Sequence, residues 1–235
     1  MEILNELKYQ FKLEVDVKTS FSDLMSKFIE TVPNGRRELI RRIKSRFDQI
    51  ETFPKLYFSA TRFHKEIASN PLIDTIITTN WDDYFERECA ASPIIDNKDV
   101  ALWNTFERRI FKIHGSINNI GSIVATSEDY EKCYDRLKNQ AIGDRLKTLL
   151  SSHTVVFIGF SFGDDDLNKI INILSEDLQE FANQYYLVTI DKLWKEKNDS
   201  RIIPIITDGV FFIHSLNNIL INSGLLFSNA LYDYA

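Results

Sequence analysis

The chain has 235 residues, 44% of them hydrophobic and 26% charged, which is typical of a soluble globular protein with one large core. Its formal net charge of -6 at pH 7 provides no overall positive field, so direct binding of nucleic acid is not expected. The two isolated cysteines, Cys89 and Cys133, exclude a paired CxxC zinc ribbon and a disulfide framework, which predicts a cytoplasmic protein. No apolar stretch approaches membrane-spanning length, so no membrane association is expected.

Residues 1–70 are expected to form helices, a helical N-terminal portion packed on the same domain as the rest of the chain. Apolar residues such as Leu24, Phe28 and Ile29 recur there at helical spacing. One of these helices is strongly basic, and a solvated face of an amphipathic helix is favoured over a contact with a partner or nucleic acid. Its basic residues are Arg36, Arg37, Arg41, Arg42, Lys44 and Arg46.

From residue 71 to residue 235 short β-branched runs alternate with helical segments, which predicts an α/β fold with a doubly wound, mostly parallel Rossmann-like sheet flanked by helices. Strands are expected at 72–79, 109–114, 154–160, 184–190 and 202–213, the last as two short strands. Helices are expected at 82–90, 128–138, 142–152, 164–180 and 215–223. The segment 92–105 is expected to form a loop over the sheet edge.

Polar side chains follow the first two of these strands. Asn80 and Asp82 come after one strand and His114 after the next, so neighbouring parallel strands would bring an amide, a carboxylate and an imidazole to one sheet edge. Spacing alone supports helix capping by Asn80 and Asp82 equally well. His114 precedes Gly115 in a turn and is a candidate general base. Structural or surface roles are favoured for His64, His153 and His214.

The strand at 154–160 breaks into Gly159 and Ser161 before a predicted helix. Glycine permits close approach of a ligand to the backbone, and a helix N-terminus offers N–H groups, but capping by Ser161 is an equal alternative. For the aspartates at 164–166, helix capping is favoured over metal binding, because metal ligands must converge. Asp191 follows the next strand, as ribose ligands do in dinucleotide-binding folds, although a turn-forming role is favoured.

Three segments together resemble the sirtuin-like domains of the silent-information-regulator family, particularly those of bacterial antiphage defence proteins. They read TTNWDD, FKIHGS and VVFIGFSFGDDDL, and the stretch from Ile123 to Tyr130 also matches a recurring segment of that group. The resemblance extends from about residue 72 to about residue 220.

The resemblance implies a site for NAD, which is the substrate, and requires no metal. His114 would be the catalytic base, Asn80 would position the ribose or the attacking water, and Asp82 would hold the nicotinamide carboxamide. The other NAD-binding residues implied are Thr79, Gly159, Ser161 and Asp191. Of these, Gly159 and Ser161 would face the adenosine half, and Asp191 its ribose.

The resemblance further implies an NAD+ hydrolase that acts as an effector of antiphage defence by NAD depletion, as a homo-oligomer with a partner such as a motor ATPase, an Argonaute or a phage-sensing protein. A catalytically silent NAD or ADP-ribose-binding or oligomerisation module is the alternative, because none of the eight glycines stands in a GxGxxG-like cluster. We therefore expect either a partial version of a longer polypeptide or a chain that lost its first βα unit. NAD-dependent protein deacylation ranks third, because two cysteines cannot build a four-cysteine zinc module.

Overall fold

The computed structural model describes residues 19–160, 169–173, 184–192, 194 and 202–225. The helical N-terminal portion is confirmed over its described residues, which form α2 (Phe21–Thr31), α3 (Gly35–Thr52) and α4 (Pro54–Ala68). Ser20 caps α2 by accepting a hydrogen bond from the Asp23 backbone N–H at 3.1 Å. Pro54 begins α4, where the N–H that proline lacks has no helical partner to bond.

The α/β class with parallel strands is also confirmed, and each predicted strand is shorter than expected. The described strands are β1 (Thr75–Thr78), β2 (Ser92–Ile94), β3 (Arg109–Lys112), β4 (Val156–Ile158), β5 (Tyr185–Thr189) and β6 (Ile202–Ile206). They form two three-stranded parallel sheets, in the orders β1-β3-β2 and β4-β5-β6, instead of one continuous sheet. Between and around them lie α5 (Tyr84–Cys89), α7 (Ser127–Asn139) and α8 (Ala141–Ser152).

The expectation of a loop at 92–105 was wrong. Its first residues form β2, which pairs with β3 from Ser92 opposite Arg109 to Ile94 opposite Phe111. The rest contains α6 (Asn97–Ala101) and the short 3-10 helix η1 (Trp103–Thr105). A run of three residues with a central proline carries little strand signal, and the proline is tolerated because β2 lies at the edge of its sheet.

The expectation of two strands at 202–213 was wrong in its second half. After β6 the chain turns into α10 (Gly209–Asn222), which Asp208 caps by accepting a hydrogen bond from the Phe211 N–H at 2.9 Å. The run from Val210 to Ile213 is rich in strand-forming residues, and the helix cap with its burial against α4 overrides that local preference.

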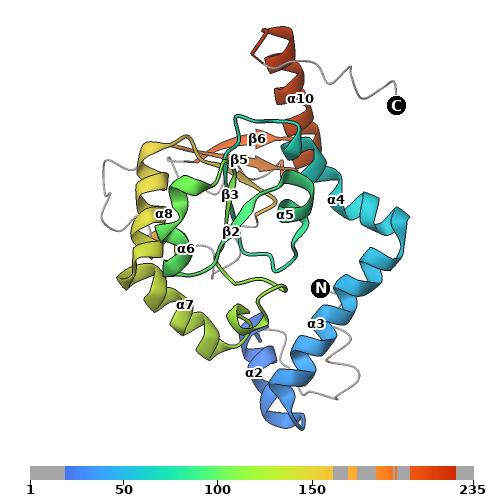
Figure 1. Cartoon of the computed structure of the whole chain (residues 1–235), viewed down its shortest axis with the longest axis vertical. Helices are drawn as coiled ribbons and strands as arrows, with labels where there is room; N and C mark the ends of the chain where they lie inside the picture. The colour runs from blue at the N-terminus through green and yellow to red at the C-terminus, as the bar shows by residue number, and fades with distance from the viewer. Residues whose placement is uncertain (1–18, 161–168, 174–183, 193, 195–201, 226–235) are drawn as a thin grey trace.

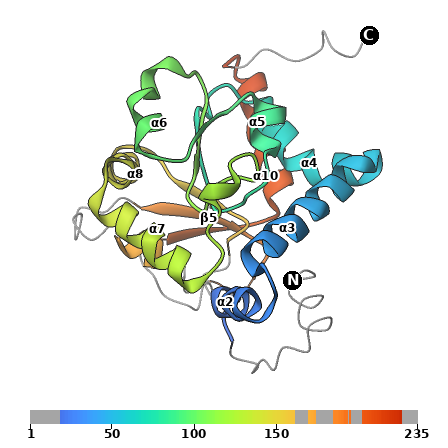
Figure 2. The same ribbon diagram turned by 60° about the horizontal axis from the view of Figure 1, so that its bottom comes forward.

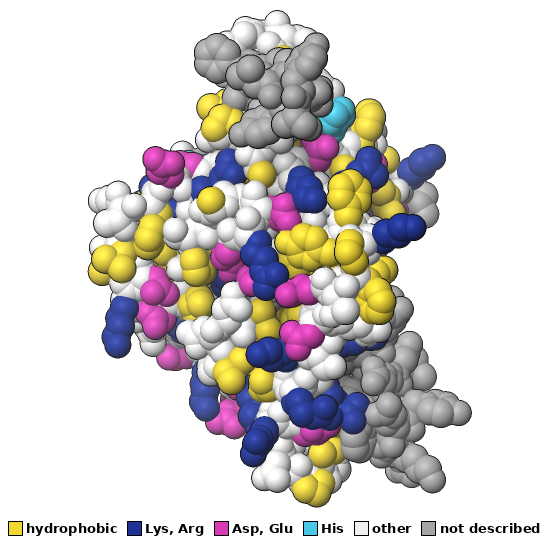
Figure 3. All heavy atoms as spheres, turned by 45° about the vertical axis from the view of Figure 1, so that its right-hand side comes forward, with side chains coloured by type: hydrophobic (Ala, Val, Ile, Leu, Met, Phe, Trp, Pro, Cys, Tyr) yellow, Lys and Arg dark blue, Asp and Glu magenta, His cyan; other side chains and the backbone are white. Residues whose placement is uncertain are grey.

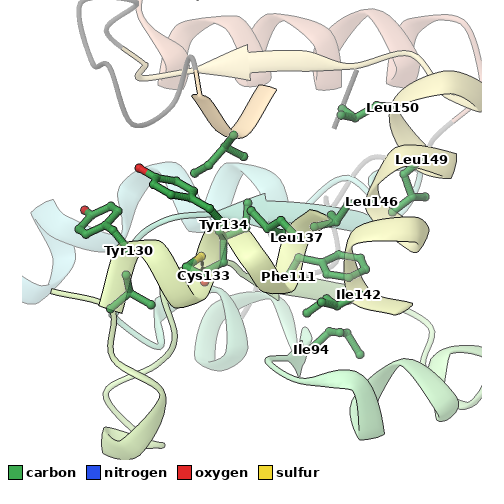
Figure 4. Packing of buried hydrophobic residues seen from close by; sticks show 13 residues of the cluster. Ile94, Phe111, Tyr130, Cys133, Tyr134, Leu137, Ile142, Leu146, Leu149 and Leu150 are labelled. Atoms are coloured by element: carbon green, nitrogen blue, oxygen red, sulfur yellow. Dashed lines mark hydrogen bonds between the residues drawn. The ribbon is translucent and has the colours of Figure 1, made fainter. Parts of the chain in front are cut away.

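The largest core lies where α7 and α8 pack on the sheet of β1, β2 and β3 (Figure 4). Phe111 of β3 is fully buried there between apolar side chains of the two helices. The helix residues of this core are Tyr130, Cys133, Tyr134, Leu137, Ile142, Leu146, Leu149 and Leu150. Burial of these side chains holds α7, and therefore the segment leading into it, against β3.

A second cluster joins the two sheets, since Ile76 of β1, Ile110 of β3 and Ile158 of β4 pack in it together with Ile213 of α10. Figure 2 shows α7 and α8 on one side of the strands and α4, α5 and α10 on the other. Among the described residues, no helix is both long enough and apolar enough to span a bilayer. The strands are thus enclosed by helices on both sides, as a doubly wound fold requires.

Candidate functional site

The two strands that end in polar residues are direct neighbours. Thr75 lies opposite Arg109 and Thr78 opposite Lys112, in parallel register. The pairing continues past the strands, because the Ile113 N–H donates to the Thr78 carbonyl at 3.0 Å. Residues 79–83 and residues 113–116 therefore leave the sheet side by side at its carboxyl edge, where open α/β sheets bind ligands.

The loop formed by residues 79–83 carries Thr79, Asn80 and Asp82. Asn80 is exposed, and its N–H donates to Thr78 Oγ1 at 3.1 Å. The following helix, α5, begins at Tyr84 with Asp83 as its N-cap residue, so Asn80 lies outside the capping positions. Asp82 Oδ1 accepts the Tyr84 N–H at 3.3 Å, which is a cap-like contact for one carboxylate oxygen. The capping interpretation thus applies to Asp82 and not to Asn80.

His114, two residues after the end of β3, is 7% exposed. Its ring meets the ring of Tyr130 edge to face, with the centroids 4.9 Å apart and the planes at 71°. The His114 carbonyl accepts the Val124 N–H at 2.9 Å, which brings the segment 123–130 back over the strand end. The imidazole thus packs against the Tyr130 ring, while the backbone of the same residue is bonded to the segment that leads to Tyr130.

A buried lysine, which the strand pattern did not single out, lies behind the same edge. Lys112 is 1% exposed, and its Nζ lies 3.2 Å from Glu86 Oε1 in α5. Burial raises the pKa of Glu86, and the nearby Lys112 ammonium opposes that rise. The signal that could have revealed this pair is a single charge inside the apolar run from Ile110 to Ile113, since a buried charge requires a partner.

Gly159 and Asp191 both lie at a different place, the carboxyl end of the other sheet. They follow β4 and β5, which pair in parallel with Ile158 opposite Val188. Gly159 is exposed with φ of 75°, a conformation that favours glycine. The Asp191 N–H donates to Thr189 Oγ1 at 3.1 Å, a turn contact at the strand end. Ser161 and the aspartates at 164–166 lie outside the described residues.

The other titratable candidates have structural surroundings. His64 is buried against the Phe85 ring with centroids 4.3 Å apart, and burial lowers its pKa. His153 and His214 are exposed, and His214 Nδ1 lies 3.2 Å from Glu66 Oε2. Cys89 and Cys133 are buried in α5 and α7. Within the described ranges, no cluster of three or more His, Cys, Asp or Glu side chains is arranged to hold a metal ion.

The basic helix α3 uses several of its charges within the chain. Arg36 Nη2 donates to the Ile123 carbonyl at 2.6 Å, and Arg36 Nη1 pairs with Asp129. Arg41 and Arg42 both bond to Glu38, at 2.6 Å and 2.9 Å. The right-hand side of Figure 1, where α3 lies, comes forward in Figure 3, and hydrophobic, basic and acidic side chains are mixed on that face. These surroundings match a solvated amphipathic face better than a continuous basic patch.

Comparison with known proteins places this edge in a family context. A sequence model of the SIR2-like domain matches residues 74–203, more than half of the chain. The chain is 34% identical over 139 residues to an NAD(+) hydrolase ThsA of Enterococcus faecium, covering 57% of this chain and 28% of that protein. It is 29% identical over 190 residues to an NAD(+) hydrolase ThsA of Cytobacillus dafuensis, covering 78% of this chain and 36% of that protein.

A third relative, Defense-associated sirtuin 2 of Bacillus subtilis, is 27% identical over 177 residues, which cover 72% of this chain and 16% of that protein. The chain therefore spans well under half the length of these curated relatives. The matched region contains both β1 and β3 and the polar residues that follow them. This chain belongs to the SIR2-like domain family.

Proposed function

We propose that the chain is an NAD+ hydrolase domain that converts NAD+ and water to ADP-ribose, nicotinamide and a proton. The observation that carries the proposal is the side-by-side exit of residues 79–83 and 113–116 from adjacent parallel strands in a SIR2-like domain. Relatives named NAD(+) hydrolase support this substrate and reaction.

Cleavage of the bond between nicotinamide and ribose builds positive charge on the sugar and releases a neutral heterocycle. Water adds to the ribose carbon, and one proton must be removed from that water molecule. We assign that proton to His114, whose buried ring is oriented by Tyr130. The exposed Asn80 positions the ribose or the attacking water, and Asp82 holds the nicotinamide carboxamide through the carboxylate oxygen that does not contact Tyr84.

The remainder of NAD is assigned to residues at the carboxyl ends of the two sheets. Thr79 belongs to the nicotinamide side, Gly159 and Ser161 face the adenosine half, and Asp191 bonds to its ribose. The exposed Gly159, with its positive φ, supports a close backbone approach by the ligand. The assigned chemistry requires no metal.

The biological role proposed is that of an antiphage effector that depletes cellular NAD in the cytoplasm and causes abortive infection. The relative named a defence-associated sirtuin supports the defence context. The chain is proposed to form a homo-oligomer and to associate with a partner defence protein, such as a motor ATPase, an Argonaute or a phage-sensing protein.

The test is nicotinamide release from NAD by the purified chain and by His114→Ala, with His153→Ala, an exposed histidine, as the control. Loss of a general base lowers turnover by about 100- to 10,000-fold, while His153→Ala retains full turnover. Equal turnover by the wild-type chain and His114→Ala removes His114 from the mechanism.

Calorimetric titration with NAD and ADP-ribose accompanies the assay. Saturable binding without nicotinamide release, in every oligomeric state tested, identifies the silent binding module instead. Nicotinamide release that depends on an added acyl-peptide identifies a deacylase.

A further inference from the structure

Lys112 is the last residue of β3 and lies two positions before His114. Its side chain has no exposed surface, although an ammonium group strongly favours water. A buried charge of this kind persists only where nearby groups compensate it. The groups that compensate the Lys112 charge therefore indicate the structural role of this lysine.

Two acceptors from a segment that is distant in sequence contact the Lys112 ammonium. Nζ donates to the backbone carbonyl of Asp82, and it pairs with Glu86 Oε1 at 3.2 Å. The first acceptor lies in the loop of residues 79–83, and the second lies in α5. The ammonium thus ties β3 to both the loop and the helix that follows it.

The Asp82 carbonyl has a particular position in that loop. The preceding carbonyl, that of Trp81, accepts the Ile117 N–H at 2.8 Å. The peptide plane after the Asp82 Cα is therefore bonded to β3, and the peptide plane before it is bonded to the turn that follows β3. Because these planes define φ and ψ of Asp82, they also define the direction in which its carboxylate leaves the backbone.

We propose that Lys112 is a positioning residue, which fixes the peptide plane after Asp82 and so aims the Asp82 carboxylate at the nicotinamide carboxamide, with Glu86 holding the ammonium in place. The proposal rests on the NAD site proposed above. Lys112 acts through Asp82 and does not itself contact the substrate.

Trp81 provides a measurement that needs no substrate. It lies in the loop, next to Asp82, and its ring packs against Phe21 with centroids 6.1 Å apart. The chain has three tryptophans, so replacing Trp103 and Trp194 by phenylalanine leaves Trp81 as the single tryptophan, which can be excited selectively over the nine tyrosines. Acrylamide quenching of its emission then reports how well the loop is held.

In that background, Lys112→Met is expected to raise the quenching constant of Trp81 about twofold or more, since the Asp82 carbonyl loses its donor. With NAD, the variant should lose about 10- to 100-fold in kcat/KM, with KM raised, because a displaced carboxylate no longer binds the carboxamide well. Lys132→Met is the matched control, because Lys132 also pairs with a glutamate, Glu128, but is 71% exposed. Its quenching and its kinetics should equal those of the wild type.

Lys112→Met leaves the Glu86 carboxylate buried without its cation, so it can fail to fold. The double variant Lys112→Met/Glu86→Leu removes both charges and should regain thermal stability. It should still show increased Trp81 quenching and reduced kcat/KM. If the double variant recovers wild-type quenching and kinetics, the pair is only structural and the proposal is overturned.

The two proposals fail in different ways. A wild-type chain that releases no nicotinamide overturns the NAD hydrolase function, whatever the quenching shows. Wild-type Trp81 quenching in Lys112→Met overturns the anchoring role of Lys112, whatever the wild-type activity.

Discussion

Gly115 follows the candidate base His114 and has φ of 83°, in the left-handed region. A Cβ at this position would lie 2.1 Å from the Ser122 carbonyl oxygen, so the turn after β3 closes directly on the glycine. Ser122 Oγ also accepts the Ser116 N–H at 3.0 Å. The turn is therefore compact because residue 115 has no side chain, and it holds His114 at the sheet edge.

Gly115→Ala is expected to lower the free energy of unfolding by more than about 1 kcal/mol, because it adds a backbone clash to an unfavourable φ. The proposed NAD hydrolysis should fall as well, since the turn must shift next to His114. Urea denaturation and the nicotinamide assay measure the two effects.

Gly224→Ala is the control, because Gly224 has a similar φ of 73° and no described atom lies within 4 Å of the position that its Cβ would occupy. It carries only the backbone cost, and activity should persist. Equal losses in both variants would show that the contact with Ser122 contributes nothing.

Lys112 illustrates why residues differ in how well they can be predicted. Asn80, Asp82 and His114 could be found because polar residues after β-branched runs mark strand ends. Lys112 lies within such a run, and only the approach of Glu86 and the Asp82 carbonyl explains its burial. Those partners belong to a segment about thirty residues away, which no local pattern connects to it.

The helix α7 begins beside the site with a well-defined cap. Thr126 Oγ1 accepts the Asp129 N–H at 3.3 Å, and Asp129 Oδ2 accepts the Thr126 N–H at 3.0 Å. This reciprocal capping box begins the helix that presents Tyr130 to His114. Arg36 of α3 pairs with the same carboxylate, so the helix start is also joined to the N-terminal helices.

Burial alone would raise the pKa of Asp129, but hydrogen bonds from the Thr126 and Ala125 N–H groups and from Arg36 lower it below its ordinary value. An acid with a lowered pKa in the folded state stabilises the fold above the ordinary aspartate pKa of about 3.9. That stabilisation is lost as the pH falls through the lower, folded-state pKa. The free energy of unfolding should therefore decrease in this acidic range.

Asp129→Asn should destabilise the protein by about 1 to 2 kcal/mol at pH 7 and flatten the acid part of its stability curve. Chemical denaturation from about pH 2.5 to about pH 7, a range that spans the ordinary aspartate pKa, measures both effects. Asp135→Asn, an exposed aspartate in the middle of α7, should leave the curve unchanged. A wild-type curve for Asp129→Asn would mean that this carboxylate does not stabilise the helix start.

Elements were predictable to the extent that local signals agreed with burial. The helices α7 and α8 were predicted to within a residue or so, because their apolar stripes and their cores coincide. The start of α10 was read as a strand, because its β-branched and aromatic residues favour strands until Asp208 caps them and α4 covers them. The edge strand β2 is too short for any periodicity to appear.

At the scale of the whole molecule, α10 closes the fold by packing on α4, as Figure 1 shows at the top of the view. A buried pair of asparagines makes this contact specific. Asn70 Nδ2 donates to Asn217 Oδ1 at 2.8 Å, and Asn217 Nδ2 donates to the Glu66 carbonyl at 2.9 Å. Asn70 and Asn217 are 1% and 5% exposed, so any loss of one partner leaves a buried polar group unbonded.

Asn217→Ala is expected to cost about 1 to 3 kcal/mol, because the Asn70 amide and the Glu66 carbonyl lose their partner inside the protein. Thermal unfolding should remain a single transition at a lower midpoint, since the cluster of Ile76, Ile158 and Ile213 couples α10 to both sheets. Asn218→Ala changes the adjacent, exposed asparagine and should be neutral. Separate transitions for α10 and the rest of the chain would contradict this coupling.

Patterns within about ten residues were enough to predict the α/β class, the helical N-terminal portion and the polar residues at the ends of β1 and β3. Only long-range packing shows that the described strands form two sheets, that β2 adds an edge to the first, and that α10 follows β6 directly. The same packing sets the partners of Lys112, Asp129 and Asn217. In each case a buried polar group or a short strand is stable only with a particular distant partner, and packing rather than local preference selects that partner.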